Sequence, residues 1–236
     1  MTGFSSALVV NAQLSASGSS EPLVPWWSFT KTVLAATALT LVRDGLVSLD
    51  EVMPGGPFTL RQLLRHEAGL ADYGELADYH AAVARGDLPW AASEMLERLD
   101  AARLRYQPGV GWGYSNVGYL YIAQLIEALT GTTLERAIEQ RVLQPLGVPA
   151  VRLANTPADL RDVEMGSAAA YHPGWVYHGL LVGRVSDAAL LLDRLLGTSL
   201  LPEMLRAEMQ TRRILGGPLA GRPWLVAGYA LGLMQG

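Results

Sequence analysis

The 236-residue chain contains no cysteine, which excludes disulfides, thiolate nucleophiles and cysteine-ligated metal sites. Its four histidines show neither an H-x-x-x-H nor an H-E-x-x-H spacing, so the sequence indicates no metal site, and we expect no metal or other cofactor. Acidic residues outnumber basic ones by 22 to 18, and the longest basic run is the pair Arg212-Arg213. A nucleic-acid partner is therefore not expected.

Long apolar segments are also missing. The first apolar stretch ends at Val10 and carries no Lys or Arg before it, so it is too short for the hydrophobic region of a signal peptide. Glycine, proline and polar residues interrupt the longest uncharged runs, 107–126 and 165–183, and neither is expected to span a membrane. We therefore expect no membrane partner and a cytoplasmic location, or a periplasmic or secreted one if a leader has been removed.

Half of the residues are apolar, and their spacing predicts a folded chain rich in helices. Between Thr32 and Val42 there is no charge, and the helical spacing from Ser28 onward predicts a buried helix that Gly45 ends. A T-x-x-Q capping box at Thr59 predicts a short helix over 60–65. We also expect a strand over 7–10, helices over 87–100, 186–196 and 202–210, a helix capped by Asn116 and stopped by Gly131, a helix from a capping box at 132–135 to 145–147, and a strand over 226–234.

Lysine is nearly absent: of the 18 basic residues, one is lysine and the others are arginine. This residue, Lys31, follows Ser28 by three positions, and residues at this spacing lie side by side on a helix, so the amine can reach the hydroxyl. A desolvated lysine can act as a base, whereas an arginine cannot be deprotonated in a protein. The pair predicts a serine nucleophile with a lysine proton partner. A chance S-x-x-K spacing is the alternative interpretation.

A second polar group, Tyr114-Ser115-Asn116, follows a glycine-rich loop over 107–113 and precedes a predicted helix. A tyrosine beside a lysine ammonium loses its proton more easily than a free phenol and can relay protons. Asn116 offers both an amide donor and an acceptor to a substrate. The alternative is that Tyr114 and Asn116 are only a turn residue and a helix cap.

With these residues in order, the sequence resembles the superfamily of serine β-lactamases and penicillin-binding proteins, in particular its class C-like branch with family VIII esterases and D-alanyl-D-alanine peptidases. The similarity runs from about Trp27 to Met234. It includes Ser-Phe-Thr-Lys-Thr at 28–32, Leu-Val-Arg-Asp-Gly-Leu-Val-Ser-Leu-Asp at 41–50, Leu-Leu-Arg-His-Glu-Ala-Gly-Leu at 63–70, Gln-Pro-Gly at 107–109, Tyr-Ser-Asn at 114–116, Gln-Pro-Leu-Gly at 144–147 and Gly-Tyr-Ala-Leu-Gly-Leu-Met at 228–234.

The resemblance implies a role for each site residue. Ser28 would be the acylated nucleophile and its backbone N–H one oxyanion donor, with Lys31 as its proton partner. Tyr114 would be the general base that also serves deacylation, and Asn116 would contact a substrate amide. His66 would be a packing and hydrogen-bonding residue. The implied activity is hydrolysis of a small-molecule ester, amide or β-lactam, by a carboxylesterase or β-lactamase-like enzyme.

The implied fold is α+β, of the β-lactamase/transpeptidase type, with an antiparallel sheet flanked by helices and a helical lobe. We expect one domain over 1–236, with a sheet side of 1–54 and 166–236, built from the two chain ends, and a helical lobe of 55–165. The family's third motif, Lys-Thr-Gly or His-x-Gly, would follow Gly-Tyr-x-Leu-Gly, but the chain stops at Gly236 first. We therefore expect an incomplete sheet whose edge promotes self-association, with the missing strand encoded further on or supplied by another chain.

Two other functions are compatible with the sequence. Residues 113–117 approach the G-x-S-x-G nucleophile elbow of α/β-hydrolases, with Ser115 as the nucleophile. A catalytically silent domain that binds a β-lactam or peptide is favoured by the missing third motif and by aromatic residues that could line a ligand groove, namely Tyr73, Trp90, Trp112 and Trp175.

Overall fold

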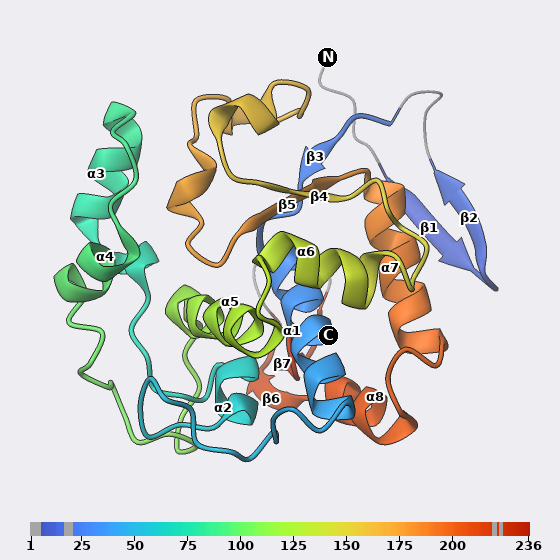
Figure 1. Ribbon diagram of the computed structural model, residues 1–236, viewed down its shortest axis with the longest axis horizontal. Helices are drawn as coiled ribbons and strands as arrows, with labels where there is room; N and C mark the ends of the chain where they lie inside the picture. Colours follow the sequence, from blue (N-terminus) through green and yellow to red (C-terminus); the bar gives the residue numbers. More distant parts are fainter. Residues whose placement is uncertain (1–5, 17–20, 219–220, 222–223) are drawn as a thin grey trace.

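The computed structural model describes residues 6–16, 21–218, 221 and 224–236, which form helices and short strands (Figure 1). The helices are α1 Thr30–Arg43, α2 Leu60–Leu64, α3 Ala77–Arg85, α4 Ala92–Arg98, α5 Asn116–Thr130, α6 Leu134–Ile138, α7 Val185–Gly197 and α8 Glu203–Gln210, with the helical turns η1 Trp27–Phe29, η2 Tyr73–Glu75, η3 Glu139–Leu143, η4 Pro157–Leu160, η5 Gly166–Ala168 and η6 Pro173–Trp175. The strands are β1 Ala7–Val10, β2 Gln13–Ala16, β3 Val24–Pro25, β4 Arg152–Ala154, β5 Leu180–Gly183, β6 Arg213–Gly216, β7 Ala227–Tyr229 and β8 Met234–Gln235.

Helix α1 runs through the middle of the molecule and packs against α5 and α6 (Figure 1). Every residue from Thr30 to Leu41 is buried, so the burial predicted from the uncharged run is confirmed up to Leu41, and Lys31 is buried as well. Its threonines are compatible with burial because their hydroxyls are hydrogen-bonded; Thr37, for example, donates to Val33 O within the helix, and Thr32 donates to Gly232 O outside it, both at 2.8 Å. Gly45 follows the helix with a φ of +73°, a conformation that favours glycine, so the predicted stop is confirmed.

Strand β5 is the central strand of the sheet β3-β5-β4 and is buried along its whole length. It runs antiparallel to β3, with Pro25 opposite Val182, and the Trp26 N–H donates to Leu181 O at 2.8 Å. The chain passes from this pairing directly into η1 and α1. The sheet therefore fixes the start of α1 relative to the residues just before β5.

The sheets differ from the single sheet expected from the two chain ends. The named strands pair antiparallel, but within the described residues they form three sheets, β1-β2, β3-β5-β4 and β6-β7-β8. The strand predicted over 7–10 is confirmed, yet β1 pairs with its neighbour β2 and packs against α7. The segment predicted as one strand over 226–234 forms β7 and β8, because Gly232, with a φ of +75°, lies in a turn between them.

The predicted helices are present, some with shifted ends. The capping box at Thr59 and the helix α2 after it are confirmed, and α7 and α8 match the ranges predicted for them within two residues. The helix predicted over 87–100 is reduced to α4, and Pro89 lies in the segment that remains non-helical.

Two predicted helix caps are wrong. The N-cap of α5 is Ser115 and not Asn116, since the Ser115 side chain accepts from the Gly118 N–H. The side chain of Thr133 caps α6 by accepting from the Arg136 N–H, so the capping box expected at 132–135 is not formed. Both errors are shifts of one position, within the usual uncertainty of helix ends.

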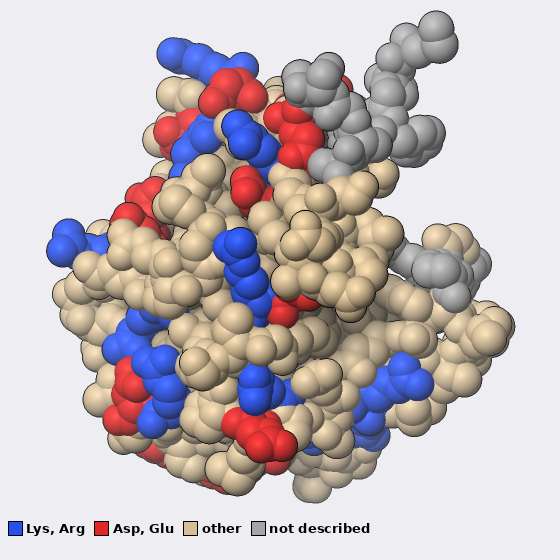
Figure 2. All heavy atoms as spheres, turned by 90° about the vertical axis from the view of Figure 1, so that its right-hand side faces the viewer, with Lys and Arg blue, Asp and Glu red and all other residues tan. Residues whose placement is uncertain are grey.

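Helices α3 and α4 lie on one side of the molecule, and the hairpin β1-β2 lies on the opposite side (Figure 1). The division of the domain into a sheet side and a lobe over 55–165 stays a prediction; strand β4, inside that range, pairs with β5. Acidic and basic side chains are interspersed on the face in Figure 2. None of the helices in the described ranges is long and apolar enough to cross a membrane.

Candidate active site

Ser28 and Tyr114 meet at the start of α1. Ser28 lies in η1 with an exposed side chain, and Tyr114 lies directly before Ser115, the cap of α5. The Ser28 hydroxyl and the Tyr114 hydroxyl share a hydrogen bond of 2.8 Å. Packing of α1 against α5 brings these residues together across 86 positions of sequence. Trp27, next to the serine, has a φ of +40°, which is uncommon for a residue with a side chain.

Lys31 lies behind this pair, and its side chain is 1% exposed. Its Nζ atom lies 3.0 Å from His178 Nε2, 5.0 Å from the centre of the Tyr114 ring and 5.7 Å from the centre of the Tyr119 ring. Burial lowers the pKa of Lys31 from its ordinary 10.5 to about 7, although the charge of Asp72 acts in the opposite direction. A large share of this amine is therefore neutral at pH 7 and able to accept a proton.

The geometry departs from the sequence-based expectation in two respects. Ser28 and Lys31 have different hydrogen-bond partners, Tyr114 and His178, rather than each other. The pKa of Tyr114 lies above its usual 10.0, because burial outweighs the hydrogen bond from Ser28. The expectation of an easily deprotonated tyrosine is therefore wrong for the free protein.

Asn116 is held by a carboxylate that the sequence reasoning missed. Its side-chain NH₂ donates to both Asp72 oxygens, at 2.9 and 3.2 Å, and its backbone N–H donates to Asp72 Oδ1 at 3.0 Å. These contacts orient the amide and occupy its donor side, which leaves the carbonyl oxygen to accept from a ligand. The one sequence signal for Asp72 is its position after Gly69-Leu70-Ala71. That pattern does not by itself predict a role in the site.

His66 is buried among the aromatic rings beside the site and has the packing and hydrogen-bonding contacts expected of it. Its Nδ1 accepts from the Ser115 N–H at 3.1 Å, which helps to fix the segment carrying Tyr114. Its ring centre is 4.4 Å from that of Tyr114 and 4.7 Å from that of Tyr229. Burial, with the charge of Lys31, lowers the pKa of His66 from 6.5 to about 3, so the imidazole is neutral.

A cavity of about 590 Å³ opens over Ser28. Its walls come from η1 and α1, the loop before α5, α7 and the C-terminal strands. Apolar and aromatic side chains dominate, and none of the described residues that line it is acidic or basic: Ser28, Phe29, Thr32, Trp112, Tyr114, Leu192, Trp224, Tyr229, Gly232, Leu233 and Met234. Trp112, one of the predicted groove aromatics, thus lines the cavity over the serine.

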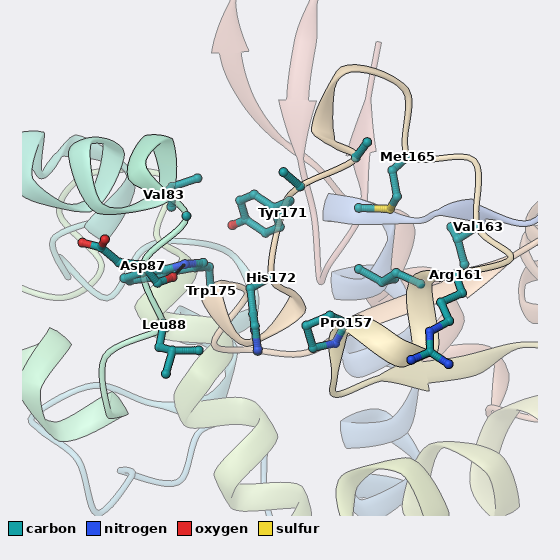
Figure 3. Close-up of a pocket in the computed structure, with 14 residues that line it drawn as sticks. Val83, Asp87, Leu88, Pro157, Arg161, Val163, Met165, Tyr171, His172 and Trp175 are labelled. Atoms are coloured by element: carbon teal, nitrogen blue, oxygen red, sulfur yellow. Dashed lines mark hydrogen bonds between the residues drawn. The ribbon is translucent and has the colours of Figure 1, made fainter.

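A second cavity, of about 610 Å³, lies between the α3 side and the segment 157–175 (Figure 3). Val83, Asp87 and Leu88 border it on one side, and Arg161 and Met165 border it on the other. It is here named the α3 groove. Its edge approaches the serine through Tyr171, whose ring centre lies 5.4 Å from that of Trp27.

Of the other predicted groove aromatics, Tyr73 lies in the core, whereas Trp175, although buried, also borders the α3 groove (Figure 3). Trp175 and Tyr73 are buried, and Trp90 packs edge-on against Trp175 and lies under the Arg98 guanidinium. Within the described ranges, no cluster of three or more His, Asp or Glu side chains is arranged to hold a metal ion.

The alternative nucleophile, Ser115, is unsuited to attack. It is 3% exposed, donates its hydroxyl proton to Ala71 O at 2.8 Å and accepts from the Gly118 N–H. Its hydroxyl therefore already donates one hydrogen bond to the loop and accepts another at the N-terminus of α5. The three antiparallel sheets are also unlike the parallel sheet on which an α/β-hydrolase elbow is built, so this interpretation is wrong.

Comparison with known proteins finds relatives that are named as different hydrolases, an esterase and a D-aminopeptidase among them. Lovastatin esterase of Penicillium rubens is 28% identical over 155 residues, which cover 51% of this chain and 37% of that protein. A D-aminopeptidase of Brucella anthropi is 27% identical over 183 residues, which cover 74% of this chain and 34% of the relative. The chain spans about a third of the length of the curated relatives it matches.

Solved structures resemble the fold over nearly the whole chain. A D-stereospecific amidohydrolase from Streptomyces sp. superposes with a TM-score of 0.74 at 25% identity and covers 94% of this chain and 74% of its own. The D-amino acid amidase from Ochrobactrum anthropi SV3 has a TM-score of 0.78 at 21% identity, with 98% and 75% covered. The family described as Beta-lactamase matches residues 19–236. The expected resemblance and α+β fold are thus confirmed, and the chain belongs to the beta-lactamase family.

Proposed function

We propose that this protein is a serine hydrolase that forms an acyl-enzyme on Ser28. The observation that carries the proposal is the 2.8 Å hydrogen bond between the Ser28 and Tyr114 hydroxyls at an apolar cavity. Behind this pair lies the Lys31 amine, whose pKa is lowered to about 7. An exposed hydroxyl, a proton relay and a buried base are the parts that nucleophilic catalysis requires. Relatives named as an esterase, aminopeptidases and an amidohydrolase support this class.

In acylation, Ser28 Oγ attacks the substrate carbonyl carbon and its proton passes to the Tyr114 oxygen as the Tyr114 proton passes to Lys31. Tyr114 acts as a relay because its raised pKa keeps it a neutral phenol. Lys31 is the final acceptor because burial brings its pKa to about 7. The ammonium then returns a proton by the same path to the departing alkoxide or amine. In deacylation, water takes the place of Ser28 as the attacking group.

Two further groups assist this chemistry. The backbone N–H of Ser28 serves as an oxyanion donor to the substrate carbonyl oxygen. The side-chain oxygen of Asn116, turned by its bonds to Asp72, accepts a hydrogen bond from a substrate amide where one is present.

We infer that the preferred substrates are uncharged esters with an apolar acyl group. The described residues that line the cavity are aromatic or aliphatic around Ser28, such as Trp112, Leu192 and Met234, and among them there is neither a cation for a carboxylate nor an anion for an ammonium. Burying an unpaired charge there would be costly, whereas each apolar group removed from water is stabilised. An ester therefore fits the cavity better than a β-lactam carboxylate or a D-amino acid amide.

The proposal is tested with p-nitrophenyl esters of increasing acyl length, beside a chromogenic cephalosporin and a D-amino acid p-nitroanilide. We expect turnover of the esters, with kcat/KM rising from acetyl toward longer acyl chains, and much slower reaction of the other two. Faster hydrolysis of either charged substrate would contradict the substrate class. Stoichiometric acylation by a penicillin without turnover of any substrate would instead support a silent binding domain.

A further inference from the structure

Behind the Ser28–Tyr114 pair lies a polar contact that the proposed mechanism leaves without a role. Lys31 Nζ is 3.0 Å from His178 Nε2, and the two residues are 1% and 2% exposed. We propose that His178 is a positioning residue, which holds the Lys31 amine and stabilises its protonated form. The contact stands on the geometry alone; its importance for catalysis rests on the proposed function.

The backbone places His178 opposite the first turn of α1. Strand β5 begins two residues later, and its Leu181 N–H donates to the side chain of Thr30, the first residue of α1, at 3.2 Å. Gly179, with a φ of +92°, forms a turn in which its N–H donates to Val176 O at 2.7 Å. A side chain at this glycine would come within 3.0 Å of Leu153. The tight turn and the sheet together leave His178 little freedom to move away from the lysine.

The hydrogen-bonding capacity of His178 is directed at the lysine. Burial, with the charge of Lys31, lowers the pKa of His178 well below 6.5, so the imidazole is neutral. Its Nδ1 atom is buried with no partner in the described part of the chain. An ammonium has donors only, so whenever Lys31 is protonated, His178 Nε2 must accept from it and the ring proton sits on Nδ1.

This arrangement also orients the neutral amine. A neutral amine carries two N–H bonds and one lone pair, arranged tetrahedrally. When one N–H points at His178 Nε2, the lone pair is turned away from the histidine and is left to accept a proton. The Tyr114 ring lies 5.0 Å from Nζ, so the proposed relay is close to the amine. When the proton arrives, His178 remains bonded to the resulting ammonium.

The other groups around Lys31 act differently. The Tyr114 and Tyr119 rings face Nζ at 5.0 and 5.7 Å and attract an ammonium weakly through their π-systems. Asp72 attracts it through its charge. His66 is neutral. Replacing His178 by an apolar side chain would therefore remove the hydrogen bond to the ammonium while the burial remains, and the pKa of Lys31 would fall.

The chain offers a direct measurement, because its one lysine gives a single signal after labelling with ¹³C at the lysine Cε. We expect this signal to titrate near pH 7 in the wild type. In His178→Phe the midpoint should fall by about one pH unit, since a hydrogen bond to a charged group is lost. In His178→Gln, which keeps an acceptor, it should return toward the wild-type value. His80→Gln is the control, because His80 is exposed and bonds Gly74 O.

Each outcome bears on the proposal. A shift of less than about 0.3 pH unit in folded His178→Phe would overturn it, whatever the esterase activity. If the midpoint moves but the wild type hydrolyses none of the test substrates, the positioning role stands and the proposed function fails. If esters are hydrolysed, the acid limb of the pH dependence of kcat/KM should move with the midpoint in His178→Phe and recover in His178→Gln, which a purely structural histidine would not produce.

If His178→Phe does not fold, a measurement on the wild-type protein tests the proposal instead. With ¹⁵N-labelled histidine, the Nε2 signal of His178 should change with the same midpoint as the lysine signal, while the ring stays neutral. A His178 signal that is insensitive to the titration of Lys31 would overturn the proposal.

Discussion

The cavity over Ser28 and the α3 groove have nearly equal volumes, about 590 and 610 Å³, but differ in chemistry. The first is lined by Ser28 and Tyr114, whose hydroxyls are hydrogen-bonded to each other, and the buried Lys31 amine, whose pKa is lowered, lies behind them. The second has charges at its edges, Asp87 and Arg161, and the carboxylate of Asp87 is already paired with Arg85 at 2.6 Å.

The difference teaches that the arrangement of titratable groups, and not cavity size, distinguishes the candidate active site from the other cavity. In the cavity over Ser28, burial changes the acidity of groups that also touch one another. In the α3 groove the charged groups are partly exposed and separated by apolar side chains (Figure 3). Substitutions in the two cavities should therefore have very different effects.

The largest effect among these substitutions is expected at Lys31. Lys31→Arg keeps a positive charge but removes a base that can become neutral, so ester hydrolysis should fall by about 10²–10⁴-fold. In the wild type, kcat/KM should rise as the pH increases through about 7, because burial lowers the pKa of Lys31 to that value and the neutral amine is the active form.

The variant should lose this limb of the pH profile. Lys31→Met, which fits a buried site more easily, provides a second test, with circular dichroism to verify folding. Rates close to the wild type in both variants would contradict the assignment of Lys31 as the base.

A smaller loss is expected at the relay. Tyr114→Phe removes the hydroxyl bonded to Ser28 but keeps the ring, and should lower kcat by about 10²-fold. Tyr121→Phe is the matched control, because Tyr121 lies on α5, the helix that follows Tyr114, and stacks on Phe58 away from the serine. Equal activity of the two variants would show that Tyr114 is not part of the proton path.

A loss of about tenfold in kcat/KM is expected at Asp72, which acts through Asn116 and Lys31. Asp72→Asn weakens the grip on Asn116 and removes the charge that raises the pKa of Lys31. We expect kcat/KM to fall by about tenfold and its acid limb to move to lower pH. Asp87→Asn in the α3 groove is the control and should leave the profile unchanged. If the acid limb of Asp72→Asn stays at the wild-type pH, the charge of Asp72 does not influence the pKa of Lys31.

The smallest effect is expected in the α3 groove. Arg161→Ala removes an exposed guanidinium at its edge, and kcat/KM for the esters should stay within about twofold of the wild type, as for most surface substitutions. The same substrate panel measures it. A loss of tenfold or more would place the groove in the substrate path and remove the distinction drawn between the two cavities.

The elements that the sequence predicts well are those with a local signal. The uncharged run of α1, its stop at Gly45 and the capping box at Thr59 depend on residues near one another, and all three are confirmed. Helix α3 and the two-residue strand β3 were not foreseen. Strand β3 exists through its pairing with β5, more than 150 positions away, and local spacing carries no trace of such a contact.

The site follows the same division. Ser28, Lys31 and Tyr114 stand in motifs, and the structure brings all three together, although their catalytic roles stay predictions. His178 and Asp72 were missed because their importance comes from burial and from partners distant in sequence. The raised pKa of Tyr114 was missed for the same reason, since the degree of burial cannot be counted from spacing. Self-association through an open sheet edge also stays a prediction.

The central claim, that Ser28 is the acylated nucleophile, is tested most directly by mass spectrometry after reaction with a fluorophosphonate. Trypsin separates the two candidate serines, because the first basic residue is Lys31, whereas Ser115 lies between Arg105 and Arg136. We predict one adduct per chain, on the 1–31 peptide and assigned to Ser28 by fragmentation, and no adduct in Ser28→Ala. An adduct on the peptide that contains Ser115, or none on the folded wild-type protein, would contradict the account.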